Sequence, residues 1–172
     1  MLTGDTSESG RLNALAEYEV LDTPEEDAFD DLTALAAQIC DAPMALITIV
    51  EEHRQWFKSR IGIDAEETPR DISFCSHALK ELDLFIIPDA REDERFASNP
   101  LVTGEPFLRF YAGAPLVNDD GHALGTLCVL DSVPRELNGS QRRALRILSR
   151  VVLAQLELRR SNIKRRRRAS QR

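Results

Sequence analysis

The segment from Met44 to Val50 (MALITIV) constrains the fold more than any other part of the chain. It is rich in β-branched residues and apolar on both faces of a pleated strand, so packing must cover both faces. The segments from Arg109 to Val117 and from His122 to Asp131 are also apolar on both faces, and the turn-forming sequence between them favours a hairpin. A chain of 172 residues, 42% of them hydrophobic, is long enough for one such covered sheet.

Two helices are predicted before the first strand. One extends from Arg11 to Leu21, where apolar residues recur at near-helical spacing. The other follows Thr23, whose hydroxyl we expect to pair with Glu26 in a capping box, with Pro24 in the first turn. Its apolar positions form one stripe that needs a sheet to pack on: Phe29, Leu32, Leu35, Ala36 and Ile39.

Shorter elements are predicted in the middle of the chain. Arg54 to Ile61 is the expected hairpin partner of the first strand, and Leu84 to Ile87 is typical of a short strand. Ser73 to Lys80 favours a short helix with Ser73 as its N-cap. The stretch from Asp89 to Pro106 is irregular and long for a connection, as binding loops often are. Together these elements predict an α+β domain with a mostly antiparallel sheet and helices on both faces.

The last predicted helix begins after Asn138, which pairs with Gln141 in a capping box. Its apolar residues occupy an arc about 200° wide, whereas one docked face needs about 100°. The chain's own sheet can cover one part of this arc and a second copy of the chain the other, so we predict a homodimer. A helix buried more deeply in its own core is the alternative. The predicted dimer contacts on this helix are Leu145, Leu148, Val151, Val152 and Gln155.

The net charge of −7 is divided unevenly along the chain. Up to Pro134 there are 27 acidic and 9 basic residues, and from Arg135 onward there are 2 acidic and 13 basic residues. The basic run from Lys164 to Arg168 could meet nucleic acid or an anionic membrane surface. The acidic body would repel both, so we interpret the run as the solvated end of a helix and expect neither nucleic acid nor membrane as a partner.

Three segments are predicted: a disordered tail over 1–10, one domain over 11–160 that includes the first and last helices, and a basic tail over 161–172. No apolar run approaches the roughly 20 residues of a membrane span. The N-terminal residues are polar and lack the pattern of a secretory signal. We therefore expect a cytoplasmic protein.

Residue spacing alone indicates neither a catalytic nor a metal site. Cys40, Cys75 and Cys128 are widely spaced and include no CxxC pair, so reduced thiols are expected. Cys75 and His77 are two residues apart, about 200° around a helix, so they would face different ways. No cysteine or histidine pair has the spacing of a zinc site, and the phosphate-binding sequence GxxxxGK(S/T) is missing.

Several blocks of the sequence resemble the GAF domain family, as found in bacterial sensor histidine kinases and diguanylate cyclases. They are Leu21 to Pro24, Arg54 to Lys58, Glu67 to Ala78, Asn99 to Val102, Phe110 to Leu116 and Gly125 to Asp131. The resemblance covers the chain from Leu12 to Leu158 and implies a GAF/PAS-like fold with a sheet of about six strands. It also implies a small-molecule pocket on one face of the sheet and, on the other, a dimer layer of the N- and C-terminal helices.

The resemblance further implies a non-catalytic sensory role in signal transduction, for example in a two-component system. A ligand would change how two final helices pack, and an output such as a histidine kinase or diguanylate cyclase would read the change. That output would lie on a separate partner or on a longer form of this chain. By their position in the family, the resemblance implies these pocket residues: Phe57, Phe74, Cys75, His77, Asp89, Phe96, Arg109, Tyr111 and Thr126.

Purely structural roles are an alternative for these residues. The phenylalanines could be plain core, and Arg109 could simply pair with a loop carboxylate. The Asn-Lys pair of the cyclic-nucleotide-binding branch is missing, and Cys75-Ser76-His77 does not match the Cys-His dipeptide of bilin attachment, so the ligand stays unidentified and no bilin or metal is expected.

Two other functions stay open. Because the free methionine sulfoxide reductases use this fold with several cysteines, a thiol redox enzyme or redox sensor centred on Cys75 is the alternative. The loop from Leu82 to Leu108 offers no resolving cysteine for it, and Cys128 is assigned to a core strand. A dimerisation module with a vestigial pocket is a third interpretation.

Overall fold

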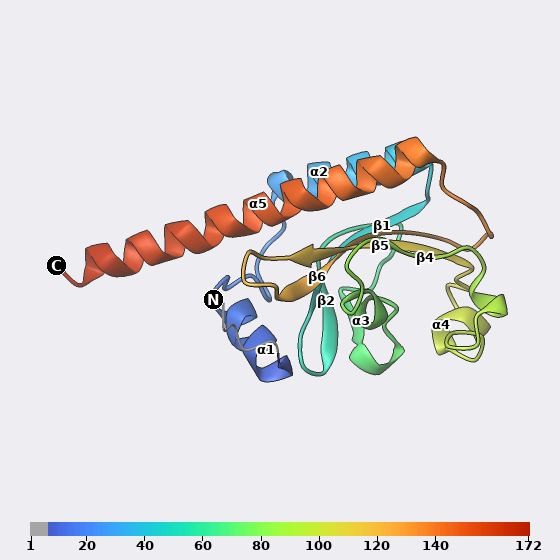
Figure 1. The fold of residues 1–172 in the computed structure, drawn as a ribbon, viewed down its shortest axis with the longest axis horizontal. Helices are drawn as coiled ribbons and strands as arrows, with labels where there is room; N and C mark the ends of the chain where they lie inside the picture. The colour runs from blue at the N-terminus through green and yellow to red at the C-terminus, as the bar shows by residue number, and fades with distance from the viewer. Residues whose placement is uncertain (1–6) are drawn as a thin grey trace.

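A computed structural model describes residues 7–172, and one six-stranded sheet forms its centre (Figure 1). The spatial order of the strands is β3, β2, β1, β6, β5 and β4. Every neighbouring pair is antiparallel, which confirms the predicted fold class. The strands are β1 (Met44–Val50), β2 (Arg54–Ile61), β3 (Glu67–Pro69), β4 (Phe85–Ile87), β5 (Phe110–Val117) and β6 (Ala123–Asp131).

Helices cover both faces of the sheet. The long helices α2 (Asp27–Cys40) and α5 (Gly139–Ser170) lie side by side on one face (Figure 1). The short helices α3 (Cys75–Ala78) and α4 (Pro100–Thr103) lie on the other face, and α1 (Glu8–Ala16) packs at the end of the sheet where β6 begins. Two 3-10 turns, Arg70–Ile72 and Ala90–Glu92, complete the order of elements.

The sheet separates two hydrophobic cores because its central strands are apolar on both faces. Ile47 of β1 and Leu127 of β6 belong to the core shared with α2 and α5. Their neighbours Leu46 and Cys128 belong to the core on the α3 side. Successive side chains of a strand point to opposite faces, so the run MALITIV supplies both cores at once.

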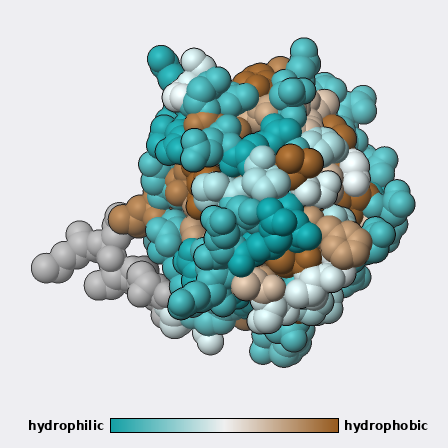
Figure 2. All heavy atoms as spheres, turned by 90° about the vertical axis from the view of Figure 1, so that its right-hand side faces the viewer, coloured by the Kyte–Doolittle hydropathy of each residue, from teal (hydrophilic) through white to brown (hydrophobic). Residues whose placement is uncertain are grey.

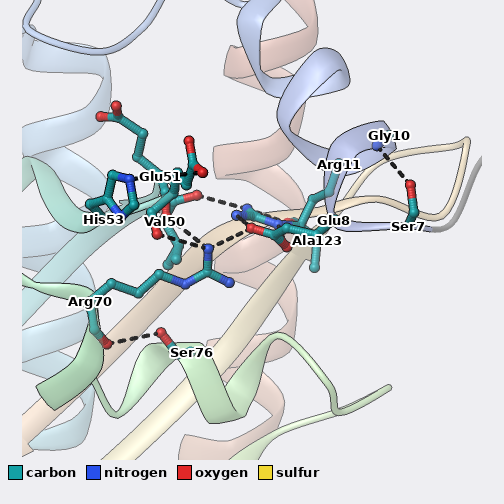
Figure 3. Close-up of polar contacts among 11 residues, drawn as sticks. Ser7, Glu8, Gly10, Arg11, Val50, Glu51, His53, Arg70, Ser76 and Ala123 are labelled. Carbon is teal, nitrogen blue, oxygen red and sulfur yellow. Dashed lines mark hydrogen bonds and ion pairs between the residues drawn. The ribbon is translucent and has the colours of Figure 1, made fainter.

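Helix α1 is fixed to the sheet through Arg11. The buried Arg11 guanidinium donates to the carbonyls of Val50 (2.7 Å) and Ala123 (3.2 Å) and pairs with Glu8 (2.9 Å) (Figure 3). Arg70, which follows β3, also donates to Glu8. Two guanidinium groups therefore hold one carboxylate, and this network joins α1 to the ends of β1 and β6.

The predicted capping box at Thr23 is wrong. Helix α2 begins at Asp27, and its N-cap residue Glu26 makes no side-chain cap. Thr23 Oγ1 instead donates to the Val20 carbonyl and accepts a hydrogen bond from Lys58 Nζ (2.8 Å). A tertiary contact to a buried lysine has taken the hydroxyl that the local pattern assigned to the helix end.

Both segments predicted as tails contain helix. Of the tail predicted over 1–10, residues 1–6 lie outside the described residues and 8–10 belong to α1. The basic segment 161–172 continues α5 without a break as far as Ser170, and this end of the helix projects beyond the sheet (Figure 1). Within the described residues, no helix combines the length and the apolar character needed to cross a membrane.

Strand β3 was not predicted from the sequence. It is three residues long, mostly exposed, and ends in Pro69 at the edge of the sheet. An edge strand of this kind has no alternating hydrophobic pattern to detect, and proline is tolerated there because one side of the strand is unpaired.

Helix α5 has the wide apolar arc that was predicted, but most of the predicted dimer contacts face the wrong way. The prediction that Leu145, Leu148 and Val152 contact a partner chain is wrong, because all three are buried in the chain's own core. Val151 is 39% exposed and Gln155 is half-buried. Periodicity gives the width of an apolar arc, but it does not tell which edge of the arc meets the sheet.

Candidate ligand cavity

A cavity of about 200 Å³ lies between the sheet and the segment that contains α3 and α4. Ala65 and Glu105 are exposed lining residues, so they mark its mouth. Strands β1, β2, β3, β5 and β6, the connection between β2 and β3, the segment around α3, α4 and the loop after α4 supply the lining. The lining residues are Leu46, Gln55, Phe57, Ile63, Ala65, Thr68, Phe74, Cys75, Leu101, Glu105, Pro106, Leu108, Tyr111, Cys128 and Leu130.

The chemistry of this lining is mostly apolar. Among its described residues there is no lysine, arginine or histidine, and Glu105 is the one carboxylate. The amide of Gln55 is already used, because its nitrogen donates to Thr68 Oγ1 (3.2 Å) and its oxygen accepts from Ser73 Oγ (2.6 Å). A volume below the range of about 300–1,000 Å³ typical of drug-sized ligands suits a small molecule.

Four of the predicted pocket residues line the cavity: Phe57, Phe74, Cys75 and Tyr111. Two others support it from behind. Phe96 stacks on Phe74 with ring centroids 4.2 Å apart, and Thr126 Oγ1 donates to Cys75 Sγ at 3.1 Å.

The other three predicted pocket residues lie outside this cavity. His77 packs edge-on against Phe96 and lines a separate surface hollow, and burial and the positive charges of Lys80 and Arg95 lower its pKa. Asp89 pairs with Arg91 at 2.7 Å, and Arg109 donates to the carbonyls of Val102 and Leu108. His77 lies in a block that borders the cavity, but the direction of its side chain depends on local backbone that no motif specifies.

Cys128 is the site residue that sequence reasoning missed. Its sulfur lies 4.0 Å from Cys75 Sγ, so the expectation that Cys75 has no cysteine partner is wrong. A signal was present in the pattern, because residues two apart on a strand share a face. Placing Thr126 at the pocket therefore also places Cys128 there.

Cys75 Sγ is the centre of a buried hydrogen-bond network. Tyr111 Oη and Thr126 Oγ1 each donate to it at 3.1 Å, and Thr126 Oγ1 lies 2.9 Å from Thr48 Oγ1. Burial alone would raise the pKa of Cys75, but hydrogen bonds from Cys128, Thr126 and Tyr111 outweigh it and lower the pKa to about 7. Burial and the neighbouring Cys75 raise the pKa of Cys128.

No group of three or more metal-ligating side chains occurs in the described part of the chain. The match to a known family agrees with the order of strands and helices described above. The GAF domain model matches residues 24–159, which is most of the chain. The chain belongs to the GAF domain family. The matched range includes all six strands, α2 and most of α5.

Among curated proteins, this GAF domain is similar to a cyclic di-GMP phosphodiesterase of Pseudomonas aeruginosa. The two are 45% identical over 116 residues, which is 67% of this chain and 20% of that protein. The match thus spans about one fifth of that relative.

Solved structures share the fold at low identity. A GAF domain from an Acinetobacter phosphoenolpyruvate-protein phosphotransferase has a TM-score of 0.65 at 16% identity, over 87% of this chain and 92% of that one. A domain of a putative two-component sensor histidine kinase from Sinorhizobium meliloti has a TM-score of 0.63 at 13% identity, over 82% and 97% of the two chains. The free methionine-R-sulfoxide reductase of Neisseria meningitidis scores 0.63 at 13% identity, over 90% of each chain.

Proposed function

We propose that this GAF domain binds a small, uncharged and largely apolar molecule and signals its presence through a helical homodimer. The observation that carries the proposal is the apolar cavity of about 200 Å³ on the sheet face opposite α2 and α5. The domain itself is non-catalytic in this proposal, and catalysis belongs to an output that reads the helices.

The lining of the cavity supports an uncharged ligand. A phosphate or carboxylate ligand needs positive side chains or free backbone amides, and the described lining offers no basic residue. Glu105 at the mouth would repel an anion further. The rings of Phe57, Phe74 and Tyr111 instead offer apolar surface on which a flat or branched hydrocarbon group can pack.

Strand β6 connects the cavity to the long helices. Cys128 and Leu130 line the cavity, whereas Leu127 and Val129, on the opposite face, belong to the core shared with α2 and α5. Close-packed cores transmit small displacements because they have little free volume to absorb them. A ligand that shifts β6 would therefore shift the surface on which α5 rests.

The proposed partner on α2 and α5 is a second copy of this chain. On α5 an exposed strip has the 4-3-4 spacing of a coiled-coil seam, and on α2 a second strip has the same spacing. In these strips Leu35 is 42%, Ile147 40% and Leu158 55% exposed. The seam residues are Ile147, Val151, Ala154 and Leu158 on α5, and Ala28, Leu32, Leu35 and Ile39 on α2.

Helices α2 and α5 pack side by side and antiparallel, so the two strips belong to one layer. At one end Gln141 donates to the Ile39 carbonyl (3.2 Å), and at the other Arg159 lies 3.6 Å from Glu26. An apolar face made of two adjacent helices can pack on its own copy about a two-fold axis and form a four-helix layer. The end of the molecule that carries α4 is different, since it is mostly hydrophilic with separate apolar side chains (Figure 2).

The proposed output is an enzyme attached to, or bound by, the C-terminal end of α5. The similarity to a cyclic di-GMP phosphodiesterase supports a cyclic di-GMP enzyme in this role, and the shared fold of a sensor kinase domain is compatible with a histidine kinase. Helix α5 extends about 48 Å, at 1.5 Å per residue over its 32 residues, so it can reach such a partner from the sheet.

A cavity-filling variant tests the ligand proposal. Small uncharged aromatic and aliphatic compounds are screened by thermal unfolding against wild type and Leu101→Trp, in which the larger ring occupies the cavity. At a compound concentration 100 times the Kd, wild type gains ~2.7 kcal/mol, a rise in Tm of about 5–10 °C for a chain of this size. Leu101→Trp gains nothing, while Leu82→Gln, at a fully exposed residue outside the cavity, responds like wild type.

Two results would contradict the ligand proposal. Equal shifts in wild type and Leu101→Trp would place binding elsewhere on the molecule. A wild-type domain that responds to no compound, and from which no small molecule is extracted after purification, favours the dimerisation module without a ligand.

A further inference from the structure

The cavity also contains a pair of cysteines whose chemistry does not depend on a bound ligand. Cys75 on α3 and Cys128 on β6 are 2% and 0% exposed, and their sulfurs are 4.0 Å apart. Both side chains line the cavity. The chain's third cysteine, Cys40, belongs to the core on the opposite face of the sheet.

The surroundings of Cys75 favour a thiolate. Hydroxyl groups of Tyr111 and Thr126 both donate to its sulfur, and a sulfur that accepts two hydroxyl hydrogen bonds gains more from them when it is negatively charged. Cys40 is the internal contrast, because burial raises its pKa to about 11. The thiolate is the nucleophilic form of cysteine, so the two thiols differ in expected reactivity.

The cavity also gives a small reagent access to these sulfurs. Its mouth lies at the exposed residues Ala65 and Glu105, and its volume of about 200 Å³ far exceeds the ~30 Å³ share of one water molecule in the liquid. A hydroperoxide is small and uncharged, and therefore neither Glu105 nor the apolar walls exclude it.

We propose that Cys75 and Cys128 form a dithiol site that reduces a hydroperoxide and closes to a disulfide. The Cys75 thiolate attacks the peroxide oxygen, the O–O bond breaks, and the leaving oxygen takes the proton that Cys75 gave up. This step yields the sulfenic acid of Cys75 and water, or an alcohol from an organic hydroperoxide. The Cys128 sulfur then attacks the Cys75 sulfur, the S–O bond breaks, and the Cys128 proton leaves with the hydroxide as water.

The two steps balance. Two thiols lose two electrons and two protons, and one hydroperoxide is reduced by two electrons. The sulfurs must approach from 4.0 Å to the bonded distance of about 2.05 Å. Cys128 is held in β6 between β1 and β5, whereas Cys75 belongs to a helix of four residues, so most of the movement falls on α3.

Closure of the disulfide also changes the ligand cavity. Cys75 gives up its acceptor role for Tyr111 and Thr126, and its sulfur moves along the cavity wall toward Cys128. The oxidised and reduced forms therefore present different walls to a ligand.

The test counts thiols after peroxide treatment. The reduced, folded chain is exposed to hydrogen peroxide, unfolded in acid, alkylated and examined by intact mass and peptide mapping. We expect two of the three cysteines to lose alkylation, a cross-link between the peptides of Cys75 and Cys128, and full alkylation of Cys40. In Cys128→Ser the reaction stops at a Cys75 sulfenic acid, which dimedone traps; in Cys75→Ser no thiol is oxidised.

Three results would overturn this inference. They are full alkylation of all three cysteines after peroxide, a disulfide that includes Cys40, or a sulfenic acid on Cys75 of wild type that never closes. Cys40→Ser is the matched control and should oxidise like wild type. If a serine variant unfolds, as shown by circular dichroism, the corresponding alanine variant or the wild-type peptide map alone still decides the outcome.

Discussion

Lys58 is a buried charge that holds the connection between α1 and α2. Its side chain is 0% exposed, and Nζ donates to Thr23 Oγ1 (2.8 Å) and the Pro24 carbonyl (2.7 Å). It also pairs with Glu26 at 2.5 Å and lies over the ring of Phe29. These contacts explain why Thr23 does not cap α2, which the local sequence alone favoured.

Replacing this lysine tests how much the connection contributes to stability. We expect Lys58→Met to lower the free energy of unfolding by ~1–3 kcal/mol, because the Pro24 carbonyl loses its charged donor. Urea unfolding measures the change as a lower midpoint at constant m. The control Arg91→Met removes an exposed ion pair and should cost less than ~0.5 kcal/mol. Equal costs for the two variants would contradict the role of Lys58.

Glu8 provides a prediction about pH. Hydrogen bonds from Arg11 and then Arg70 lower the pKa of Glu8 from its ordinary value of 4.5 to about 2. Because the folded pKa is below the unfolded one, this contribution is complete above pH 4.5 and is lost as the pH falls toward about 2. The difference in unfolding free energy between wild type and Glu8→Gln should therefore shrink over that range, and a difference independent of pH would contradict it.

Cys128 illustrates what the sequence could and could not reveal about single residues. Strand alternation places it on the same face as Thr126, so its presence at the cavity was predictable. The 4.0 Å contact with Cys75 was not, because it depends on how α3 lies over the sheet. His77 shows the same limit, since its block is near the cavity but its side chain packs against Phe96.

For helix α5, the sequence predicted the width of the apolar arc but not which part of the arc faces the sheet. The capping box of Asn138 and Gln141 and the apolar arc are both present. Leu148 faces the core and Ile147, the preceding residue, faces outward. A rotation of one residue, 100° around the helix, separates these outcomes, and only packing against α2 and the sheet decides between them.

The exposed seam of α5 makes the dimer testable with one substitution. Val151→Glu places a charge in the middle of the proposed interface, and we expect analytical ultracentrifugation to show a monomer where wild type is a dimer. Its fold should be retained because Val151 is 39% exposed. Leu82→Glu, the same kind of change at a fully exposed residue outside the seam, should leave the dimer intact.

A wild-type chain that sediments as a monomer at all concentrations would contradict the dimer. Loss of the dimer in both variants would instead assign the effect to charge alone. If Leu148 were a dimer contact, Leu148→Glu would dissociate the dimer. Because Leu148 is buried, this substitution instead places a charge in the core of the chain.

For the molecule as a whole, the structure explains why an acidic body is joined to a basic C-terminal segment. Basic residues of the projecting end of α5 pair with acidic residues that follow α1: Arg160 and Lys164 with Glu17, and Arg167 with Glu19. The basic end of α5 therefore binds acidic residues of its own chain, which take the place of the nucleic acid or anionic membrane considered from the sequence.

These ion pairs predict a salt effect. They are partly exposed, so ionic strength should screen them. We expect hydrogen exchange of the backbone between 160 and 170 to accelerate at 1 M salt relative to 0.05 M, while exchange of β1 and β6 stays unchanged. Unchanged exchange at the end of α5 would show that the pairs do not order it.

The overall architecture was the most predictable level. Strands apolar on both faces required a sheet between two layers of helices, and the resemblance supplied the family. The cavity was less predictable, because its shape depends on the side chains of the loop between β4 and β5, which the sequence indicated only as a long irregular connection.

Native mass spectrometry of the freshly purified chain tests the central claim most directly. We expect a mass of two chains plus a small uncharged molecule in each, with Leu101→Trp giving a dimer that has lost the added mass and Val151→Glu giving a monomer that keeps it. A monomer without any added mass, at every concentration and after incubation with the screened compounds, would contradict the account of a ligand-binding domain that signals through a helical dimer.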